Sequence, residues 1–116
     1  MLSWSSHQSE TEVDLGAVAV GHGDAGLPLG SELLRFATAA ATTRGDPTEM
    51  GEARDALVAS GGEAAMVDAA AVAANFHMMT RLADGTGARY PAARLDEMAP
   101  TIARMGAGDM ASRRVG

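Results

Sequence analysis

The apolar positions between residues 31 and 84 recur at helical spacing and predict three helices. The first covers about residues 31–43, opens with Ser31 as a candidate N-cap and closes before Gly45 as a C-terminal glycine. The second begins with Asp46 as N-cap, Pro47 at the first helical position and Glu49 three residues after the cap, which together form a capping box. It ends at the glycine pair 61–62. Its expected buried stripe consists of Met50, Ala53, Leu57 and Val58.

The third helix is the most apolar element of the chain. It is expected from about Glu63 to Asp84, with Gly85 and Gly87 as stop signals, and such a helix is roughly 30 Å long. Apolar residues occupy most of its circumference, which is typical of a helix buried against several neighbours. One face holds Val67, Ala70, Ala71, Ala74, Met78 and Leu82, and a second holds Val72, Phe76, Met79 and Ala83.

The flanking segments carry weaker patterns. VDLGAVAV, residues 13–20, is a short β-like run, and the glycine-rich stretch 21–30 has the composition of a loop. AARLDEMAPTIARMG predicts a weaker helix in which Pro100 should cause a break or a kink, and whose apolar residues, ending at Met105, could cover the core. We therefore expect a flexible segment over 1–28, an all-α domain of three to four helices over 29–106, and a flexible tail over 107–116.

The composition suggests that such a bundle does not complete its core alone. Nearly half of the residues are hydrophobic (47%), but Ala dominates, with eight Met and only four aromatic side chains. Replacing Leu or Phe by Ala forfeits on the order of 2 kcal/mol of burial per site. We therefore expect a homo-oligomer that assembles through the helix over 63–84.

Charge and missing residue types exclude several functions. The net charge is −6, and no arginine cluster is larger than the pair Arg113–Arg114, so nucleic acid and acidic membranes are poor partners. The chain has no Lys, which excludes Schiff-base chemistry, and no Cys, which excludes disulfides and thiolate catalysis. No uncharged apolar run approaches the ~18 residues of a membrane span, and the start MLSWSSHQSE lacks a basic signal region. A cytoplasmic location is expected.

Four sequence segments then point to a family: LLRFA, DP, ALVASGGEAAMVDAAAVAANF and RLADGTG. Over residues 32–87 they resemble the C-terminal half of the alkylhydroperoxidase D-like or carboxymuconolactone decarboxylase-like superfamily. Many relatives end the long helix with a Phe-Asn-x-x-Asn-Arg-x-Ala-Asp-x-x-Gly pattern. His77 and Thr80 stand here where the asparagines would be. The matching positions are Phe76, Arg81, Ala83, Asp84 and Gly87.

The resemblance implies an all-α fold that assembles through helix faces, usually into trimers or hexamers. Peroxidase members of the superfamily use a Cys-x-x-Cys pair in the N-terminal half, and that chemistry cannot be carried over to a chain without cysteine. A thiol-less, non-catalytic module is one expectation, either forming a homo-oligomer or acting with a separately encoded partner chain. Cofactor-independent acid–base chemistry of the decarboxylase branch is the alternative.

The polar residues of the third helix are the candidate site. His77 is a candidate general acid or base, because imidazole titrates near neutral pH, and Asp84 is a carboxylate that could orient it. The simpler interpretation of His77 is a hydrogen-bonded histidine at an interface. Arg81 and Asp84 lie three residues apart, a spacing typical of a structural ion pair, and Asn75 is expected as a buried polar group that fixes helix register.

A glycine motif raises one further possibility. GHGDAG, residues 21–26, satisfies the dinucleotide fingerprint G-x-G-x-x-G and follows the β-like run. The segment after it supplies no second parallel strand, and the acidic residue at the required distance, Asp46, already serves as a helix cap. His7 and His22 both lie in the segment that is expected to be flexible, and His22 has no carboxylate at helical spacing. We expect no cofactor and no metal site, and keep dinucleotide binding as a distant alternative.

Overall fold

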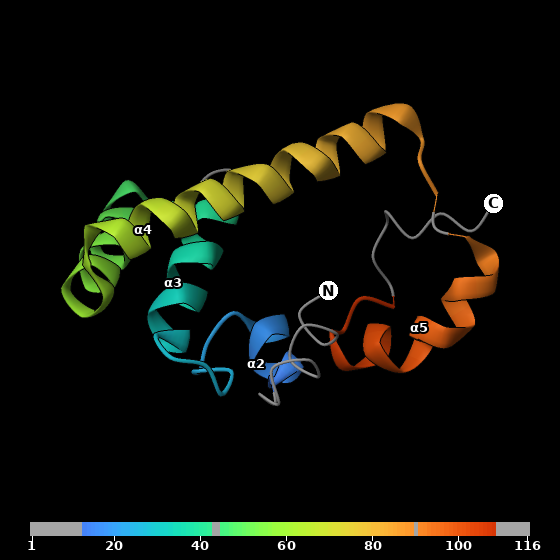
Figure 1. Ribbon diagram of the computed structural model, residues 1–116, viewed down its shortest axis with the longest axis horizontal. Coiled ribbons are helices and arrows are strands. Elements are labelled where there is room, and N and C mark those ends of the chain that lie inside the picture. Colours follow the sequence, from blue (N-terminus) through green and yellow to red (C-terminus); the bar gives the residue numbers. More distant parts are fainter. Residues whose placement is uncertain (1–12, 43–44, 90, 109–116) are drawn as a thin grey trace.

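A computed structural model describes residues 13–42, 45–89 and 91–108, and these residues form an all-α protein (Figure 1). The predicted fold class is therefore confirmed. The described residues contain no strand. Their helices are α2 (Leu15–Val20), α3 (Gly30–Ala41), α4 (Pro47–Thr86) and α5 (Ala92–Arg104).

Helix α2 replaces the β-like run that the sequence predicted, so that expectation is wrong. The Asp14 carboxylate accepts hydrogen bonds from the backbone N–H groups of Gly16 (2.8 Å) and Ala17 (3.3 Å), which satisfies the first turn of the helix. Gly21, in the left-handed conformation, ends it. A six-residue apolar run carries too little periodicity to distinguish a strand from a helix, and here the cap decides.

A small buried cluster joins α2 to the loop that follows it. Its buried members are Val13, Leu15 and Ala25, and Leu34 of α3 packs against them. The packed region therefore begins by Val13, rather than at residue 29 as the sequence pattern suggested. Residues 1–12 and 109–116, to which frayed ends were assigned, lie outside the described residues.

Helix α3 begins one residue earlier than predicted, and Ser31 is not its cap. Leu29 holds the N-cap position, and the Ser31 hydroxyl donates to the carboxylate of Glu32 at 2.7 Å. Gly30 is required at the first position, because a Cβ there would lie 1.6 Å from the carbonyl oxygen of Asp24. The loop thus approaches the helix too closely for any side chain.

Helix α4 joins the second and third predicted helices across a kink. Asp46 caps it as predicted, accepting from the N–H of Thr48 at 2.8 Å, and Gly87 in the left-handed conformation ends it. Gly62 has φ 84° and ψ 169°, a non-helical backbone that alanine cannot adopt without strain. The kink divides α4 into a first arm, residues 47–61, and a second arm, residues 63–86.

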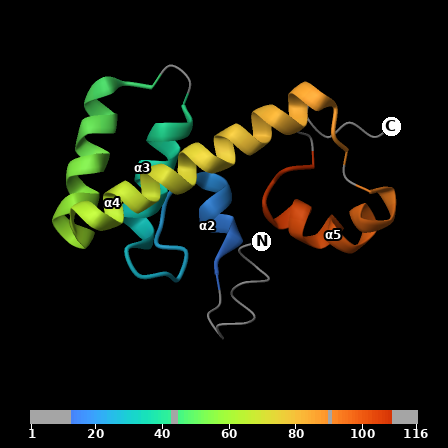
Figure 2. The same cartoon turned by 45° about the horizontal axis from the view of Figure 1, so that its top comes forward.

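The two arms of α4 differ in burial. The first arm packs against α3, where Phe36, Ala53 and Leu57 are buried. No residue of the second arm is buried; the arm begins beside α3, and its C-terminal part extends away from α3 (Figures 1 and 2). The expectation that this segment is buried against several neighbours is therefore not met within one chain. The radius of gyration, 15.4 Å, accordingly exceeds the ~13 Å of a compact chain of this length.

Helix α5 lies next to α2 and continues through Pro100, which does not break it. Its partly buried residues Leu95, Met98 and Ile102 recur at helical spacing, as the sequence predicted, and Met105 remains 37% exposed. Helix α5 packs only loosely against the rest of the protein, since none of its residues is fully buried.

Candidate functional site on the second arm of α4

The candidate catalytic residues of the second arm form a different contact from the one predicted. Arg81 Nε donates to His77 Nε2 at 3.4 Å, so this imidazole nitrogen acts as an acceptor. The ion pairs of the described residues include neither Arg81 nor Asp84, so the predicted Arg81–Asp84 pair is absent. Asp84 is exposed and does not orient His77, which leaves the imidazole without a carboxylate partner.

Asn75 is also placed differently from the prediction. Its side chain is exposed in the single chain, and its amide nitrogen donates, among the described residues, to the sulfur of Met79 at 3.7 Å. This is a weak contact, because a thioether is a poor acceptor. The expectation that Asn75 is buried is therefore not met within one chain.

A groove lies between α3 and the second arm. Its volume is about 700 Å³, and most of its wall is alanine from both helices. His77 and Thr80 are its polar side chains, and the Thr80 hydroxyl donates to the carbonyl of Phe76 at 2.9 Å. The groove thus presents one imidazole and no nucleophile–base pair, which is little for acid–base catalysis.

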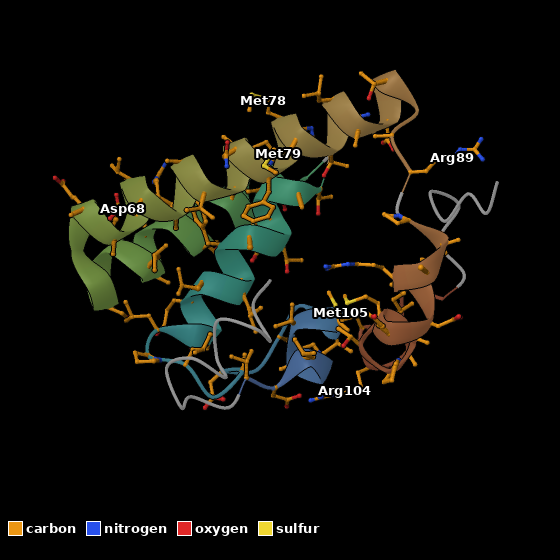
Figure 3. The ribbon with its side chains drawn as sticks, turned by 45° about the vertical axis from the view of Figure 1, so that its right-hand side comes forward. Asp68, Met78, Met79, Arg89, Arg104 and Met105 are labelled. Atoms are coloured by element: carbon orange, nitrogen blue, oxygen red, sulfur yellow. The ribbon has the colours of Figure 1, made fainter. Side chains whose placement is uncertain are left out.

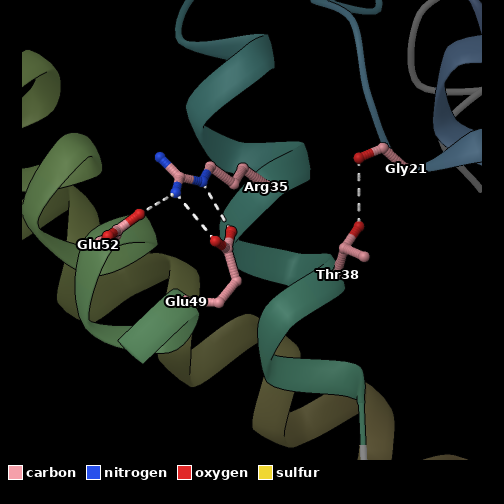
Figure 4. Close-up of polar contacts among 5 residues, drawn as sticks. All are labelled: Gly21, Arg35, Thr38, Glu49 and Glu52. Carbon is pink, nitrogen blue, oxygen red and sulfur yellow. Dashed lines mark hydrogen bonds and ion pairs between the residues drawn. The ribbon is translucent and has the colours of Figure 1, made fainter. Parts of the chain in front are cut away.

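A polar cluster that the sequence reasoning missed connects α3 to the first arm (Figure 4). Arg35 donates to both carboxylate oxygens of Glu49, at 2.7 and 3.0 Å, and to Glu52 at 2.9 Å. The Arg35 guanidinium lowers the pKa of Glu49 from its ordinary value through these hydrogen bonds. Beside it, Thr38 donates to the carbonyl of Gly21 at 3.3 Å, which ties the end of α2 to α3.

This cluster depends on contacts between two helices. Glu49 was assigned to a capping box, but both of its oxygens are engaged by Arg35, fourteen residues away. No local spacing rule links two residues at that separation in different helices, so only the sign of the charges could have suggested the pair. The adjoining pocket, about 290 Å³, is bordered by two carboxylates, those of Asp46 and Glu49, of which Glu49 pairs with Arg35.

The glycine motif does not form a dinucleotide site. Gly21 ends α2, and Gly23 and Gly26 have positive φ in the loop that follows, so a helix and not a strand precedes the turn. His22 is exposed in the same loop, and His7 lies outside the described residues. Among the residues with described positions, no group of three or more His, Cys, Asp or Glu side chains is arranged to hold a metal ion.

The most unusual feature of the second arm is its apolar surface, on which Figure 3 labels Met78 and Met79. Monomeric proteins rarely expose a contiguous apolar patch larger than a few hundred Å². Six large apolar side chains are 46–64% exposed along this arm: Val67, Val72, Phe76, Met78, Met79 and Leu82.

The same property makes α4 a candidate membrane span. Among the described residues, this one helix is long and apolar enough to cross a bilayer by length and composition. Its longest uncharged run, Ala69 to Thr80, has 12 residues and spans about 18 Å, against a hydrocarbon core of about 30 Å. The length and composition of α4 thus permit a span, although its longest uncharged run is shorter than the hydrocarbon core.

Comparisons with known proteins identify no relative. No family model, no curated protein and no solved structure matches the chain. The resemblance to the alkylhydroperoxidase D-like superfamily therefore rests on the residues of 32–87 alone.

Proposed function

We propose that this chain is a non-catalytic helical module that self-associates through the second arm of α4. The observation that carries the proposal is the set of six half-exposed large apolar side chains on an arm without a buried residue. Burying such a side chain completely is worth about 1.5–3 kcal/mol, so covering the remaining half yields roughly 1 kcal/mol each. Six per chain are enough to offset part of the ~4–15 kcal/mol cost of association.

Family membership forms part of the same proposal. A thiol-less relative of the alkylhydroperoxidase D-like superfamily would keep the helical scaffold and the apolar assembly helix without the peroxidatic cysteines. The order of the elements supports this proposal. The first arm of α4, capped at Asp46-Pro47, is followed by the long apolar second arm, which ends in the sequence Arg-Leu-Ala-Asp-Gly-Thr-Gly. A separately encoded partner chain would be an equally suitable occupant of the arm in that scheme.

A second candidate function has one observation in its favour. His77 borders the groove of about 700 Å³ between α3 and the second arm, a position from which an imidazole could exchange a proton with a bound molecule. This supports the cofactor-independent acid–base enzyme of the decarboxylase branch. Turnover of lactone or carboxylated substrates that disappears in His77→Ala, with the assembly intact, would favour this candidate over the first.

The self-association proposal is tested by light scattering coupled to gel filtration over a wide range of concentrations. The protein is expected to elute as an oligomer that dissociates on dilution. Met78→Gln combined with Leu82→Gln should shift it to smaller species with an unchanged circular dichroism spectrum, because both side chains are 60% or more exposed in the single chain.

Val20→Gln is the matched control. Val20 of α2 is also 60% exposed but lies outside the arm, so its replacement should leave the assembly unchanged. A wild-type protein that remains a monodisperse monomer at the highest concentration would contradict the proposal. Equal dissociation by Val20→Gln would show that the second arm is not the contact.

A further inference from the structure

We propose that two copies of the chain pair antiparallel along the second arm, with Glu63 of each copy beside Arg81 of the other. This inference rests on the proposed self-association and adds the orientation, the register and the residues that set them. It commits to one occupant, a second copy, because the charges and the side-chain sizes of the arm are complementary to themselves when the direction is reversed.

The charges of the arm provide the first argument. Glu63 and Arg81 are 18 residues apart, which is five turns of 3.6 residues, so they lie on the same flank about 27 Å from each other. Both are exposed. The ion pairs of the described residues join Arg35 to Glu49 and Glu52, and Arg54 to Asp55. Glu63 and Arg81, unlike Asp68 and Asp84, share this flank, and neither of the two has an ionic partner within the described part of the chain.

Orientation follows from where these charges meet. In a parallel pair each residue lies level with its own counterpart but on the opposite side of the seam, so neither Glu63 nor Arg81 meets an opposite charge. In an antiparallel pair centred on residue 72, each Glu63 meets an Arg81. Exposed ion pairs add little affinity, but opposite and like charges at the same positions select the orientation of a complex. The helix dipoles of the two arms also oppose each other only in the antiparallel arrangement.

The location of the seam follows from which side of the arm is covered. Successive helical residues are 100° apart. Four of the six partly buried residues of the arm lie within about 100° of one another and mark the side nearest α3: Met66, Ala69, Ala70 and Ala73. On the opposite side, Val67, Ala71, Met78 and Leu82 form a strip about 60° wide. Three of these side chains are 58–64% exposed, and the fourth is an exposed alanine. We call these four residues the outer strip.

Side-chain size provides the second, independent argument. The larger residues of the outer strip, Met78 and Leu82, lie in the C-terminal half of the arm, whereas the smaller Val67 and Ala71 lie in its N-terminal half, just after the kink residue Gly62. With residue 72 at the centre, Leu82 comes level with Gly62 of the other copy, and Met78 lies beside Val67. Ala71 lies within about 3 Å, along the axis, of its own counterpart, and these small side chains permit close approach of the helices. A parallel pair instead stacks large residues on large residues at one end and leaves small residues apart at the other.

The size of the contact indicates its strength. An arm of 24 residues is about 36 Å long, and one helix face about 10 Å wide provides a strip smaller than the ~800 Å² per partner of a standard stable interface. The pair is thus expected to dissociate on dilution. Reversing one charge, in Glu63→Arg or Arg81→Glu, should weaken it about tenfold, because two attractive contacts become repulsive.

Cysteine cross-linking tests the orientation directly, because the natural chain contains no cysteine. Val67→Cys and Met78→Cys are prepared separately and oxidised alone and as a mixture. In the antiparallel register, each residue lies about 15–18 Å along the axis from its own counterpart, too far for a disulfide, whereas Val67 and Met78 are nearly level. The expected result is a cross-linked dimer in the mixture only.

Other outcomes identify which part of the reasoning fails. Cross-linking of each variant with itself would show a parallel pair, which overturns this inference and leaves the proposed self-association standing. A monomer without cross-links under all conditions would overturn both. Flotation of a monomeric wild-type protein with phosphatidylcholine vesicles would instead identify a membrane as the occupant.

The charge-swapped double variant provides the last check. Glu63→Arg combined with Arg81→Glu restores opposite charges across the antiparallel pair, so its dissociation constant should return to within about threefold of the wild type. Failure of this rescue, with each single variant weakened, would overturn the assigned ion pairs, since loss of helix stability alone predicts an additive defect.

Discussion

Replacing Gly62 by alanine tests whether a single backbone conformation holds α4 in two arms. A Cβ at Gly62 meets no heavy atom within 4 Å, so any effect must come from the backbone, whose φ is 84° and ψ 169°. Gly85 is the matched control: a Cβ there also meets nothing within 4 Å, but the residue lies within the helix and has no positive φ. The two substitutions add the same methyl group to open space and differ only in backbone conformation.

The magnitude follows from the conformations. An L-residue held in the region that Gly62 occupies costs about 1–3 kcal/mol, partly offset by ~0.4–1 kcal/mol from the reduced entropy of the unfolded chain. Gly62→Ala should therefore lower the free energy of unfolding by about 1–2 kcal/mol. Gly85→Ala should raise it by up to about 1 kcal/mol, because alanine favours a helix interior over glycine.

The assay combines urea unfolding, followed by circular dichroism, with small-angle scattering on dilute protein. If the alanine variant escapes strain by straightening α4, forty helical residues would extend to about 60 Å, beyond the 44 Å longest dimension of the protein. Either lower stability or a larger radius of gyration is expected. A Gly62→Ala variant with wild-type or higher stability and an unchanged radius of gyration would refute the assigned kink.

Three further predictions concern the packed half of the protein. Leu57→Ala should lower the free energy of unfolding by about 2–5 kcal/mol in urea, because the side chain is 0% exposed, whereas the 60% exposed Val20→Ala should change it by less than about 0.5 kcal/mol. Gly30→Ala should prevent native packing of the loop, visible as a loss of cooperative unfolding, because its Cβ would overlap a carbonyl oxygen at 1.6 Å. Because Arg35 depresses the pKa of Glu49, this pair contributes stability above the ordinary carboxyl pKa of about 4.3, and the contribution should disappear as pH falls below it. Glu49→Gln should show a flatter acid limb in the same titration, and an unchanged limb would contradict the pairing.

Local signals were reliable where all the interacting groups lie within a few residues. Asp46 followed by Pro47 marks the start of α4, and Gly87 marks its end, because a cap involves only the backbone of the adjacent turn. The same kind of signal was overlooked at Asp14, where an apolar run suggested a strand and the capping carboxylate was not considered. Ser31 shows the reverse error, since it has the chemistry of a cap but lies inside the helix.

The candidate site was predicted only in part. The sequence identified the segment with unsatisfied apolar surface, but it assigned Arg81 to Asp84, whereas the guanidinium contacts His77, one helical turn away. Both partners are at allowed helical spacings, i+3 and i−4, so spacing alone cannot choose between them. The Arg35–Glu49 pair was not predicted, because it depends on how α3 and the first arm pack.

By itself, the amino-acid sequence determined the all-α class, the breaks in the helical pattern at Gly62 and Gly87, and the exclusion of thiol and Schiff-base chemistry. The all-α class and the breaks follow from periodicity and backbone freedom, which act within a few residues. The excluded chemistry follows from the residue types that the sequence lacks. Only the tertiary structure decided that α3 covers the first arm and one side of the second, leaving the outer strip uncovered. The apolar pattern indicates how much surface must be buried. Which part of that surface is buried within one chain depends on contacts between residues distant in sequence, and these contacts form only when the helices pack.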